Sequence, residues 1–293
     1  MMQQLVKAIQ DQPLADRIAD IVQPPARRAF RQTSGAGRTL KNILSGTSIG
    51  HPLHPILKDV PVGGWTMAAV FDALAVVAPG KDFERAADVS ILTGLAGAVA
   101  SAVTGLSDWS DTTGRARRIG EVHAILNVTA TALYAAALLA RKDSRTSRVA
   151  LAYGGYGIML LGAYLGGHLV FAQQTGVNHA AKTHLPLEFR PVLPAGELKE
   201  NEPQRADYNG MPVVLVRRGE RIHALYARCA HQAGPLEKGS VEGDSIRCPW
   251  HGSRFSLEGG AVLEGPATSP QPCFETRVAA GMIEIRSRER ESP

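Results

Sequence analysis

Four residues in the last third of the chain place thiol and imidazole side chains at short spacing. They form a Cys-x-His pair, Cys229 and His231, and a Cys-x-x-His pair, Cys248 and His251. Two thiolates and two imidazoles are the ligands of structural zinc sites and also of 2Fe–2S clusters that carry two histidines on one iron. Zinc sites of this composition usually keep like ligands together, so two mixed pairs favour the iron–sulfur cluster and leave zinc as the alternative.

Segments with the pattern of short strands surround the two pairs. Gly234-Pro235 follows the first pair and Gly252 follows the second, and both supply residues typical of tight turns. The strand-like runs are 211–218, 221–227, 257–263 and 282–286. They predict a small antiparallel all-β domain over 188–288, with the two pairs on loops at its tip.

Three segments of this domain resemble a known family. CAHQAGPL (229–236) and CPWHGSRF (248–255) resemble the two ligand boxes of the Rieske 2Fe–2S family, and EGPATSPQP (264–272) resembles its proline-containing segment near the cluster. The resemblance spans about residues 190–286. It implies that the two cysteines hold one iron and the two histidines hold the solvent-facing iron.

Departures from the respiratory members of that family bear on the reduction potential. Those members join the two loops by a disulfide and supply hydrogen bonds from a Ser and a Tyr hydroxyl. Here the positions of the extra cysteines read Ala233 and Trp250, Ser253 matches the Ser, and Phe255 stands where the Tyr would be. Pro266 belongs to the proline segment beside the cluster. With fewer donors, the resemblance implies a potential near the low end of the Rieske range of about −150 to +300 mV.

The length of the chain limits its chemistry. Rieske oxygenases need a further catalytic domain with a mononuclear iron, and only about forty residues follow His251, so we do not expect an oxygenase. No G-x-G-x-x-G follows a strand, so oxidation of NAD(P)H is expected on another protein. Cys273 has no expected partner, which fits a reducing compartment.

The first half of the chain contains four apolar stretches of about the 20 residues that a helix needs to cross a bilayer. They are 60–78, 89–106, 122–140 and 149–171. The alternative is a soluble Ala-rich bundle, which requires a polar outer face that the second and fourth stretches lack. We therefore predict an α+β protein of two domains: an N-terminal arm over 1–50 with a Pro-Pro break at 24–25, a four-helix transmembrane bundle over 51–180, and the all-β Rieske domain.

Charge predicts how the bundle is oriented. Eight Lys and Arg residues precede the first crossing, and three more lie between the second and third. We expect the four stretches to cross the cell (inner) membrane, and this bias predicts that both termini and the Rieske domain lie in the cytoplasm. Residues 1–23 lack the apolar run of a signal peptide. The net charge of +5 is spread along the chain and predicts no nucleic-acid partner.

The helical region resembles a membrane domain family of uncharacterised function that is sometimes fused to a Rieske domain. The segments that carry the resemblance are GHPLHPILKDVP (50–61), TGLSDWSDT (104–112), VHAILN (122–127) and LGGHLV (165–170).

Polar side chains gather at one end of the predicted bundle, where they are costly unless they serve a function. They are His51, His54, Asp108, His123, Asn127 and His168. One hypothesis makes His123 and His168 the axial ligands of a b-type haem. A second is a quinone or proton-handling pocket in which Asp108 orients a histidine, and a third is a structural role at helix ends. His51 and His54 each precede a proline and are expected to form a turn.

Together these features predict a membrane-anchored protein that carries single electrons, or a subunit of an oxidoreductase system. The expected partners are a ferredoxin, a flavoprotein reductase or a membrane quinone system, besides the lipid bilayer itself. Because histidine titrates near neutral pH, we expect electron transfer to couple to a proton at His231 and His251. The alternative is a non-enzymatic, membrane-anchored redox or iron sensor, or an interaction module.

Overall fold

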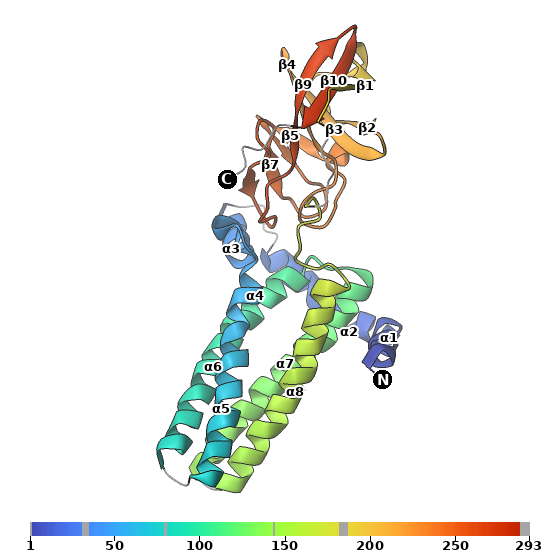
Figure 1. The fold of residues 1–293 in the computed structure, drawn as a ribbon. Coiled ribbons are helices and arrows are strands. Elements are labelled where there is room, and N and C mark those ends of the chain that lie inside the picture. The colour runs from blue at the N-terminus through green and yellow to red at the C-terminus, as the bar shows by residue number, and fades with distance from the viewer. Residues whose placement is uncertain (1, 31–34, 79–80, 143, 182–186, 288–293) are drawn as a thin grey trace. The chain divides into compact units, whose positions relative to one another are not determined.

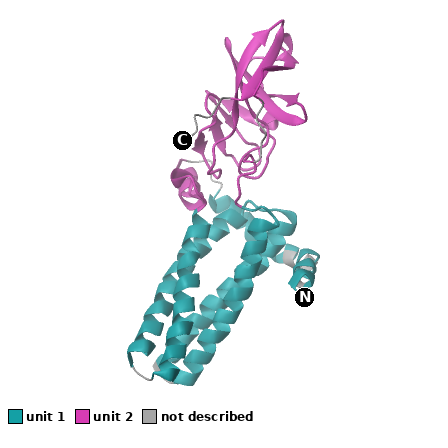
Figure 2. Cartoon of the chain, viewed as in Figure 1, with its two compact units in different colours: residues 1–32, 53–175 teal, residues 33–52, 176–293 magenta. Residues whose placement is uncertain are grey.

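A computed structural model describes residues 2–30, 35–78, 81–142, 144–181 and 187–287. The chain divides into two compact units (Figure 2). The helical unit contains residues 1–32 and 53–175, and the β unit contains residues 33–52 and 176–293. Residue 288, the expected end of the Rieske domain, lies outside the described residues.

The helical unit is built from two N-terminal helices, one short helix and then four long helices (Figure 1). Their bounds are α1 (Met2–Gln10), α2 (Pro13–Phe30), α4 (Leu53–Leu57), α5 (Asp59–Val77), α6 (Lys81–Trp109), α7 (Gly114–Leu139) and α8 (Arg145–Phe171), with a 3-10 turn η2 (Ala140–Lys142) before α8.

Four helical spans are long and apolar enough to cross a membrane, which confirms the expected number. They are 53–77, 81–109, 114–139 and 145–171. Large apolar side chains point outward along these helices, among them Val70, Val99, Val128 and Leu160. An apolar outer surface suits lipid and does not suit a soluble bundle, which needs a polar outer face.

Small residues bring α5 and α6 close together. A Cβ on Gly94 would lie 2.3 Å from the Trp65 ring, and a Cβ on Gly97 would lie 2.5 Å from Val60. Trp65 is fully buried and stacks on Tyr134 of α7 with ring centroids 4.3 Å apart. Close backbone approach at small residues is the packing expected of helices in a bilayer.

The Pro-Pro break predicted at 24–25 is wrong, because α2 continues through Pro24 and Pro25. Side chains on either side of the prolines bind the α6–α7 connection. Gln23 Nε2 donates to the main-chain oxygen of Thr112 at 2.9 Å, and Arg27 Nε donates to that of Ser110 at 2.7 Å. These tertiary bonds offset the two backbone hydrogen bonds that the prolines cannot make.

The β unit carries two antiparallel sheets (Figure 1). The six-stranded sheet has the order β1-β10-β9-β4-β3-β2 and the four-stranded sheet the order β5-β6-β7-β8. The strands are β1 (Arg190–Pro194), β2 (Gln204–Tyr208), β3 (Met211–Arg218), β4 (Arg221–Tyr226), β5 (Ser240–Glu242), β6 (Ser245–Arg247), β7 (Arg254–Ser256), β8 (Val262–Glu264), β9 (Cys273–Ala279) and β10 (Met282–Ser287), with 3-10 turns η3 (Ala195–Glu197) and η4 (Leu236–Lys238). This confirms the predicted antiparallel β-domain.

Each sheet covers part of a buried apolar core. In the six-stranded sheet, Val213, Leu215 and Ile283 lie in one core. The other face of β3 is also buried, because Val214 and Val216 lie in the second core. The second core includes Leu236, Ile246 and Phe255 together with the two cysteines of the predicted site. The predicted ligand loops therefore begin and end inside a packed core, which fixes their positions.

A segment from the N-terminal arm also belongs to the β unit. It consists of α3 (Gly35–Ser45) and the 3-10 turn η1 (Thr47–Ile49). Asn42 Oδ1 accepts a 2.8 Å hydrogen bond from the backbone N–H of Gly265, and the Thr47 hydroxyl donates to the main-chain oxygen of Ala267 at 3.3 Å. We call residues 35–49 the clamp segment, because it holds the proline segment 264–272.

Candidate metal centre

The first ligand loop is a tight turn between β4 and η4. The backbone N–H of Cys229 donates to the Gly234 oxygen at 2.8 Å, and that of Ala233 donates to the Cys229 oxygen at 2.8 Å. Ala233 takes the left-handed φ of 56° that this closure requires. The turn therefore carries Cys229 and His231 on one short loop.

Gln271 braces this loop from the proline segment. Its side-chain oxygen accepts from the backbone N–H of Ala230 at 2.9 Å, and its Nε2 donates to the main-chain oxygens of Tyr226 and Arg228 at 2.7 Å each. Gln271 is buried, so these bonds satisfy groups that have no access to water. We did not predict its role, although it lies in the proline segment that carries the resemblance.

The second ligand loop joins β6 to β7. The backbone N–H of Cys248 donates to the Ser253 oxygen at 2.8 Å, and that of Gly252 donates to the Cys248 oxygen at 3.1 Å. Gly252 has a φ of 79°, which favours glycine. The turn predicted from Gly252 is therefore present.

Arg247 braces the second loop as Gln271 braces the first. It donates to the main-chain oxygen of Gly252 at 2.8 Å and to the Glu264 carboxylate at 2.9 Å. It also forms a bidentate salt bridge with Glu242, with distances of 2.7 and 2.9 Å. The hydrogen bond to Arg247 lowers the pKa of Glu242, so this carboxylate stays charged. A paired arginine just before Cys248 was not singled out in the sequence.

The two loops meet at Gly234. A Cβ on this residue would lie 2.8 Å from the Cys248 sulfur and 3.2 Å from the Trp250 ring, so a larger residue would push the loops apart. The thiols of Cys229 and Cys248 are in hydrogen-bond contact. The rings of His231 and His251 lie with centroids 5.1 Å apart at 89°. The loops thus place thiol beside thiol and imidazole beside imidazole.

Backbone N–H groups point at both sulfurs. Those of His231 and Gln232 hydrogen-bond to Cys229, and those of Trp250 and His251 hydrogen-bond to Cys248. Contact with Cys248 and burial raise the pKa of Cys229, whereas contact with Cys229 and the two N–H groups lower the pKa of Cys248 to about 7. Donors aimed at sulfur stabilise thiolates, the form in which cysteine binds metal.

The donor set fits a 2Fe–2S cluster of the Rieske kind, with two cysteines for one iron and two histidines for the other. Both thiols are buried, at 1% and 3% exposure, and both histidines are half-buried. A single zinc ion requires four donors around one centre. Within the part of the chain that the structure describes, no three His, Cys, Asp or Glu residues are grouped as ligands of one metal ion.

The three residues predicted to neighbour the cluster are all buried. Ser253 is fully buried, and its hydroxyl oxygen accepts a 3.0 Å hydrogen bond from the backbone N–H of Ala267. Pro266 is buried next to Ala267 and follows Gly265 through a cis peptide bond. Phe255 is fully buried in the core that contains both cysteines.

In the helical unit, the ring that faces His123 is that of His54, with centroids 6.5 Å apart. His54 was expected to form a turn, but it lies in α4, because proline is tolerated in the first turn of a helix. Asn127 Nδ2 donates to the main-chain oxygen of His123 at 2.7 Å. The His168 Nε2 lies 3.4 Å from the Gln173 Nε2.

The other two predicted polar residues are Asp108 and His51. Asp108 is half-buried in the last turn of α6. His51 belongs to the β unit, is exposed, and has its Nδ1 3.0 Å from the main-chain oxygen of Pro52, within the bend where a turn was expected.

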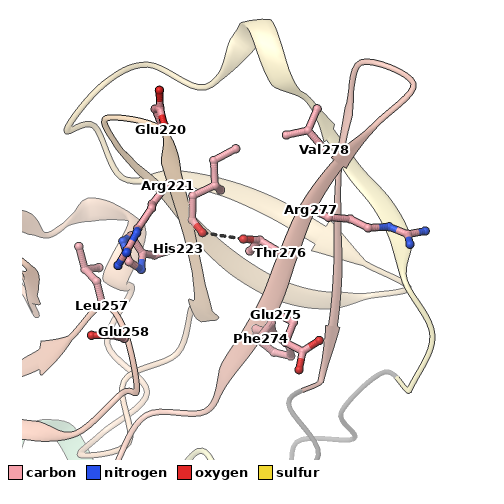
Figure 3. Close-up of a pocket in the computed structure, with 11 residues that line it drawn as sticks. Glu220, Arg221, His223, Leu257, Glu258, Phe274, Glu275, Thr276, Arg277 and Val278 are labelled. Carbon is pink, nitrogen blue, oxygen red and sulfur yellow. Dashed lines mark hydrogen bonds between the residues drawn. The ribbon is translucent and has the colours of Figure 1, made fainter.

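A groove of about 450 Å³ lies on the six-stranded sheet, where β4 and β9 diverge (Figure 3). Arg221, His223 and Val278 line it, and the Thr276 hydroxyl donates to the main-chain oxygen of Ile222 at 2.6 Å across its floor. None of the predicted cluster residues lines this groove.

Comparison with known proteins supports both halves of the chain. Residues 188–275 match the Rieske [2Fe-2S] domain family, and residues 50–179 match the family described as predicted membrane protein (DUF2231).

Similar proteins include small ferredoxins. The anthranilate 1,2-dioxygenase ferredoxin subunit of Burkholderia cepacia is 28% identical over 98 residues, which are 33% of this chain and 91% of that protein. Ferredoxin CarAc of Metapseudomonas resinovorans is 30% identical over 95 residues, which are 32% of this chain and 89% of that protein. The solved ferredoxin of carbazole 1,9a-dioxygenase from Nocardioides aromaticivorans IC177 is 26% identical, with 34% of this chain and 98% of that chain covered and a TM-score of 0.33. The chain therefore belongs to the Rieske [2Fe-2S] family, and it joins that domain to a predicted membrane domain of the DUF2231 family.

Proposed function

We propose that this protein is a membrane-anchored electron carrier whose cluster is held by Cys229, His231, Cys248 and His251. The observation that carries the proposal is the separation of the donors into a buried thiol pair and a half-exposed imidazole pair. When bound, a Rieske cluster accepts and releases one electron at a time. The protein's own residues hold the thiolates in a dry core and leave the histidine side open to a partner.

The surface beside the histidines suits transient contact with a redox partner. Trp250 is 50% exposed, and its ring centroid lies 6.3 Å from that of His251. Aromatic side chains are enriched where proteins dock. We propose that a partner approaches over Trp250 and the two imidazoles, because electron exchange is fastest where the cluster is least covered.

Similarity to ferredoxin subunits supports a redox partner protein in general. We propose that the electron donor is a ferredoxin or a flavoprotein reductase, and that the acceptor is a haem or a quinone in the membrane. The bias of basic residues supports a cell-membrane location with both termini and the Rieske domain in the cytoplasm. Protease added to inverted membrane vesicles should then release the Rieske domain, whereas sealed right-side-out vesicles should protect it.

The proposal is tested by spectroscopy on detergent-purified full-length protein. Reduction with dithionite should produce a Rieske-type EPR signal, with two irons and two acid-labile sulfides per chain. Cys229→Ser and Cys248→Ser should abolish the signal, whereas Cys273→Ser is the matched control and should retain it. Zinc at one ion per chain without that signal would overturn the proposal.

The electron-carrier role is tested separately from the cluster. Quinone in the same membranes should reoxidise the reduced cluster within the dead time of ordinary mixing, at a rate that falls when the bilayer is removed. Slow reoxidation together with a redox-dependent change in bound proteins would favour a sensor. Potentials measured from about pH 6 to 10 report proton coupling, and a flat profile would remove it.

A further inference from the structure

Two imidazoles face one another between the two halves of the helical bundle. His54 precedes α5 and packs against α6, and His123 lies on α7 and packs against α8. Their ring centroids are 6.5 Å apart, and the ring planes are nearly perpendicular at 85°. Cofactors of helical bundles sit between side chains that project inward from facing helices, which is the position of this pair.

Hydrogen bonds fix the tautomer of both rings. His54 Nδ1 lies 3.0 Å from the main-chain oxygen of Ser101, and His123 Nδ1 lies 2.8 Å from that of Gly162. A carbonyl oxygen only accepts, so each Nδ1 must carry the proton. Each Nε2 is then left with a lone pair. A backbone carbonyl on one ring nitrogen and a lone pair on the other is the usual state of a metal-binding histidine. At His123 the Asn127 Nδ2 lies 3.3 Å from that second nitrogen.

Glycines give both rings their space. A Cβ on Gly105 of α6 would lie 2.8 Å from the His54 ring, and a Cβ on Gly166 of α8 would lie 3.0 Å from the His123 ring. A Cβ on Gly162 would lie 2.9 Å from Asn127, whose Nδ2 is 3.3 Å from His123 Nε2. These close contacts hold the His54 ring against α6 and the His123 ring against α8.

The separation of the rings indicates what they bind. A metal about 2 Å from each of two opposed nitrogens places the ring centroids roughly 6 Å apart. In the described part of the chain no third His, Cys, Asp or Glu joins them as a ligand, so the remaining coordination positions would belong to a ligand that brings its own donors. A quinone fits less well, because its carbonyl oxygens need donors and both Nε2 atoms are acceptors.

We propose that His54 and His123 are the axial ligands of a b-type haem in the helical unit. The proposal deepens the proposed function, since it rests on that function for the haem's role as a redox partner of the cluster. Binding itself does not depend on the cluster. It also replaces His168 by His54 in the haem hypothesis drawn from the sequence.

The test uses full-length protein purified in mild detergent from cells supplied with a haem precursor. A Soret band and a pyridine haemochrome should give one haem per chain, measured beside the Rieske EPR signal. His54→Ala and His123→Ala should each lower haem per chain at least tenfold and leave the Rieske signal unchanged. His168→Ala is the control, since that half-buried histidine lies at the same end of the bundle and should keep its haem.

Two further measurements separate ligation from misfolding. Methionine is also an axial haem ligand, so His54→Met should keep haem but shift its reduced spectrum and raise its potential. Added imidazole should restore the Soret band of His123→Ala. Wild-type protein with an intact Rieske signal and no haem would overturn this proposal alone. Haem without a Rieske signal would overturn the proposed function and leave this site standing. Haem retained in His54→Ala but lost in His168→Ala would overturn the assignment.

Discussion

Asn42 and Gly265 lie 223 residues apart in the sequence and are joined by a 2.8 Å hydrogen bond from the Gly265 N–H to the Asn42 side chain. Thr47 sits so close to the same glycine that a Cβ there would lie 2.1 Å from its hydroxyl oxygen. Ala267, two residues on, donates its N–H to Ser253. The clamp segment therefore connects to the second ligand loop through one short stretch of backbone.

Asn42→Ala should destabilise the β unit by about 1–3 kcal/mol, because it leaves the buried Gly265 N–H without an acceptor. The loss of visible cluster absorption on heating measures this effect. Thr39→Ala is the matched control on the same helix, since the exposed Thr39 hydroxyl bonds within α3, to the main-chain oxygen of Gly35 at 3.0 Å. Equal melting midpoints for the two variants would show that the clamp segment contributes nothing to the domain.

The sequence predicted the parts of this protein that depend on local pattern. The mixed Cys/His pairs, the strand-like runs and the apolar stretches each carry their signal within a few residues. The clamp segment could not be found in this way. Residues 35–49 are an amphipathic piece whose partner, the proline segment, lies some 220 residues later. Tertiary hydrogen bonds likewise overrode the local preference of Pro24 and Pro25 to end a helix.

In the candidate site, too, some residues carry a local sequence signal and others act only through tertiary contacts. Residue types predict Cys229, His231, Cys248 and His251 as ligands. Gln271 and Arg247 act instead through long side chains that reach main-chain atoms of the loops. The pairing of His54 with His123 depends on how α6 and α8 hold each ring. Spacing along the chain placed both histidines at one end of the bundle and could not say which rings meet.

A buried ion-pair network lies at the opposite end of the helical unit from His54 and His123. Arg148 contacts both Asp72 and Asp88, and Arg141 pairs with Asp88 at 2.7 Å. The side chains of Arg148 and Asp72 are 4% and 0% exposed. Removing one partner of a buried pair leaves an uncompensated charge. Asp72→Ala should therefore lower the free energy of unfolding, measured in mixed micelles, by about 3–5 kcal/mol.

Arg145→Ala is the control for this network, because Arg145 lies on the same helix and pairs with Glu84 at half-exposed positions. Exposed pairs contribute about 0–1 kcal/mol. Replacing Asp72 and Arg148 together by apolar residues should recover much of the loss. A double variant as unstable as Asp72→Ala would show that the charges themselves are required.

Acid should loosen α2 from the helical bundle. Hydrogen bonds from Arg118 and Arg117 of α7 lower the pKa of Asp16 from its ordinary 3.8 to about 2. Because the folded pKa is depressed, these contacts contribute fully above about pH 4 and are lost as the pH falls through 2. Hydrogen exchange of α2 should therefore rise between pH 4 and 2, and Asp16→Asn should show the raised rate already at pH 7. Exchange in Asp16→Asn that matches the wild type at pH 7 would contradict this.

Hydrogen bonding near the sulfurs should set the potential of the bound cluster. Phe255→Tyr adds a hydroxyl at a fully buried position, and one new donor of about 1 kcal/mol that favours the reduced state corresponds to a rise of about 40 mV for one electron. Ser253→Ala should lower the potential, because it removes the hydroxyl donor expected beside the cluster. In the wild type the oxygen of this hydroxyl also accepts from the Ala267 N–H. Cys273→Ser, outside the ligand loops, should leave the potential unchanged.

A redox titration followed by EPR measures all three variants against the wild type, whose potential we expect near the low end of the Rieske range. A wild-type potential above about +200 mV would show that donors other than Ser253 and the four backbone N–H groups act on the cluster.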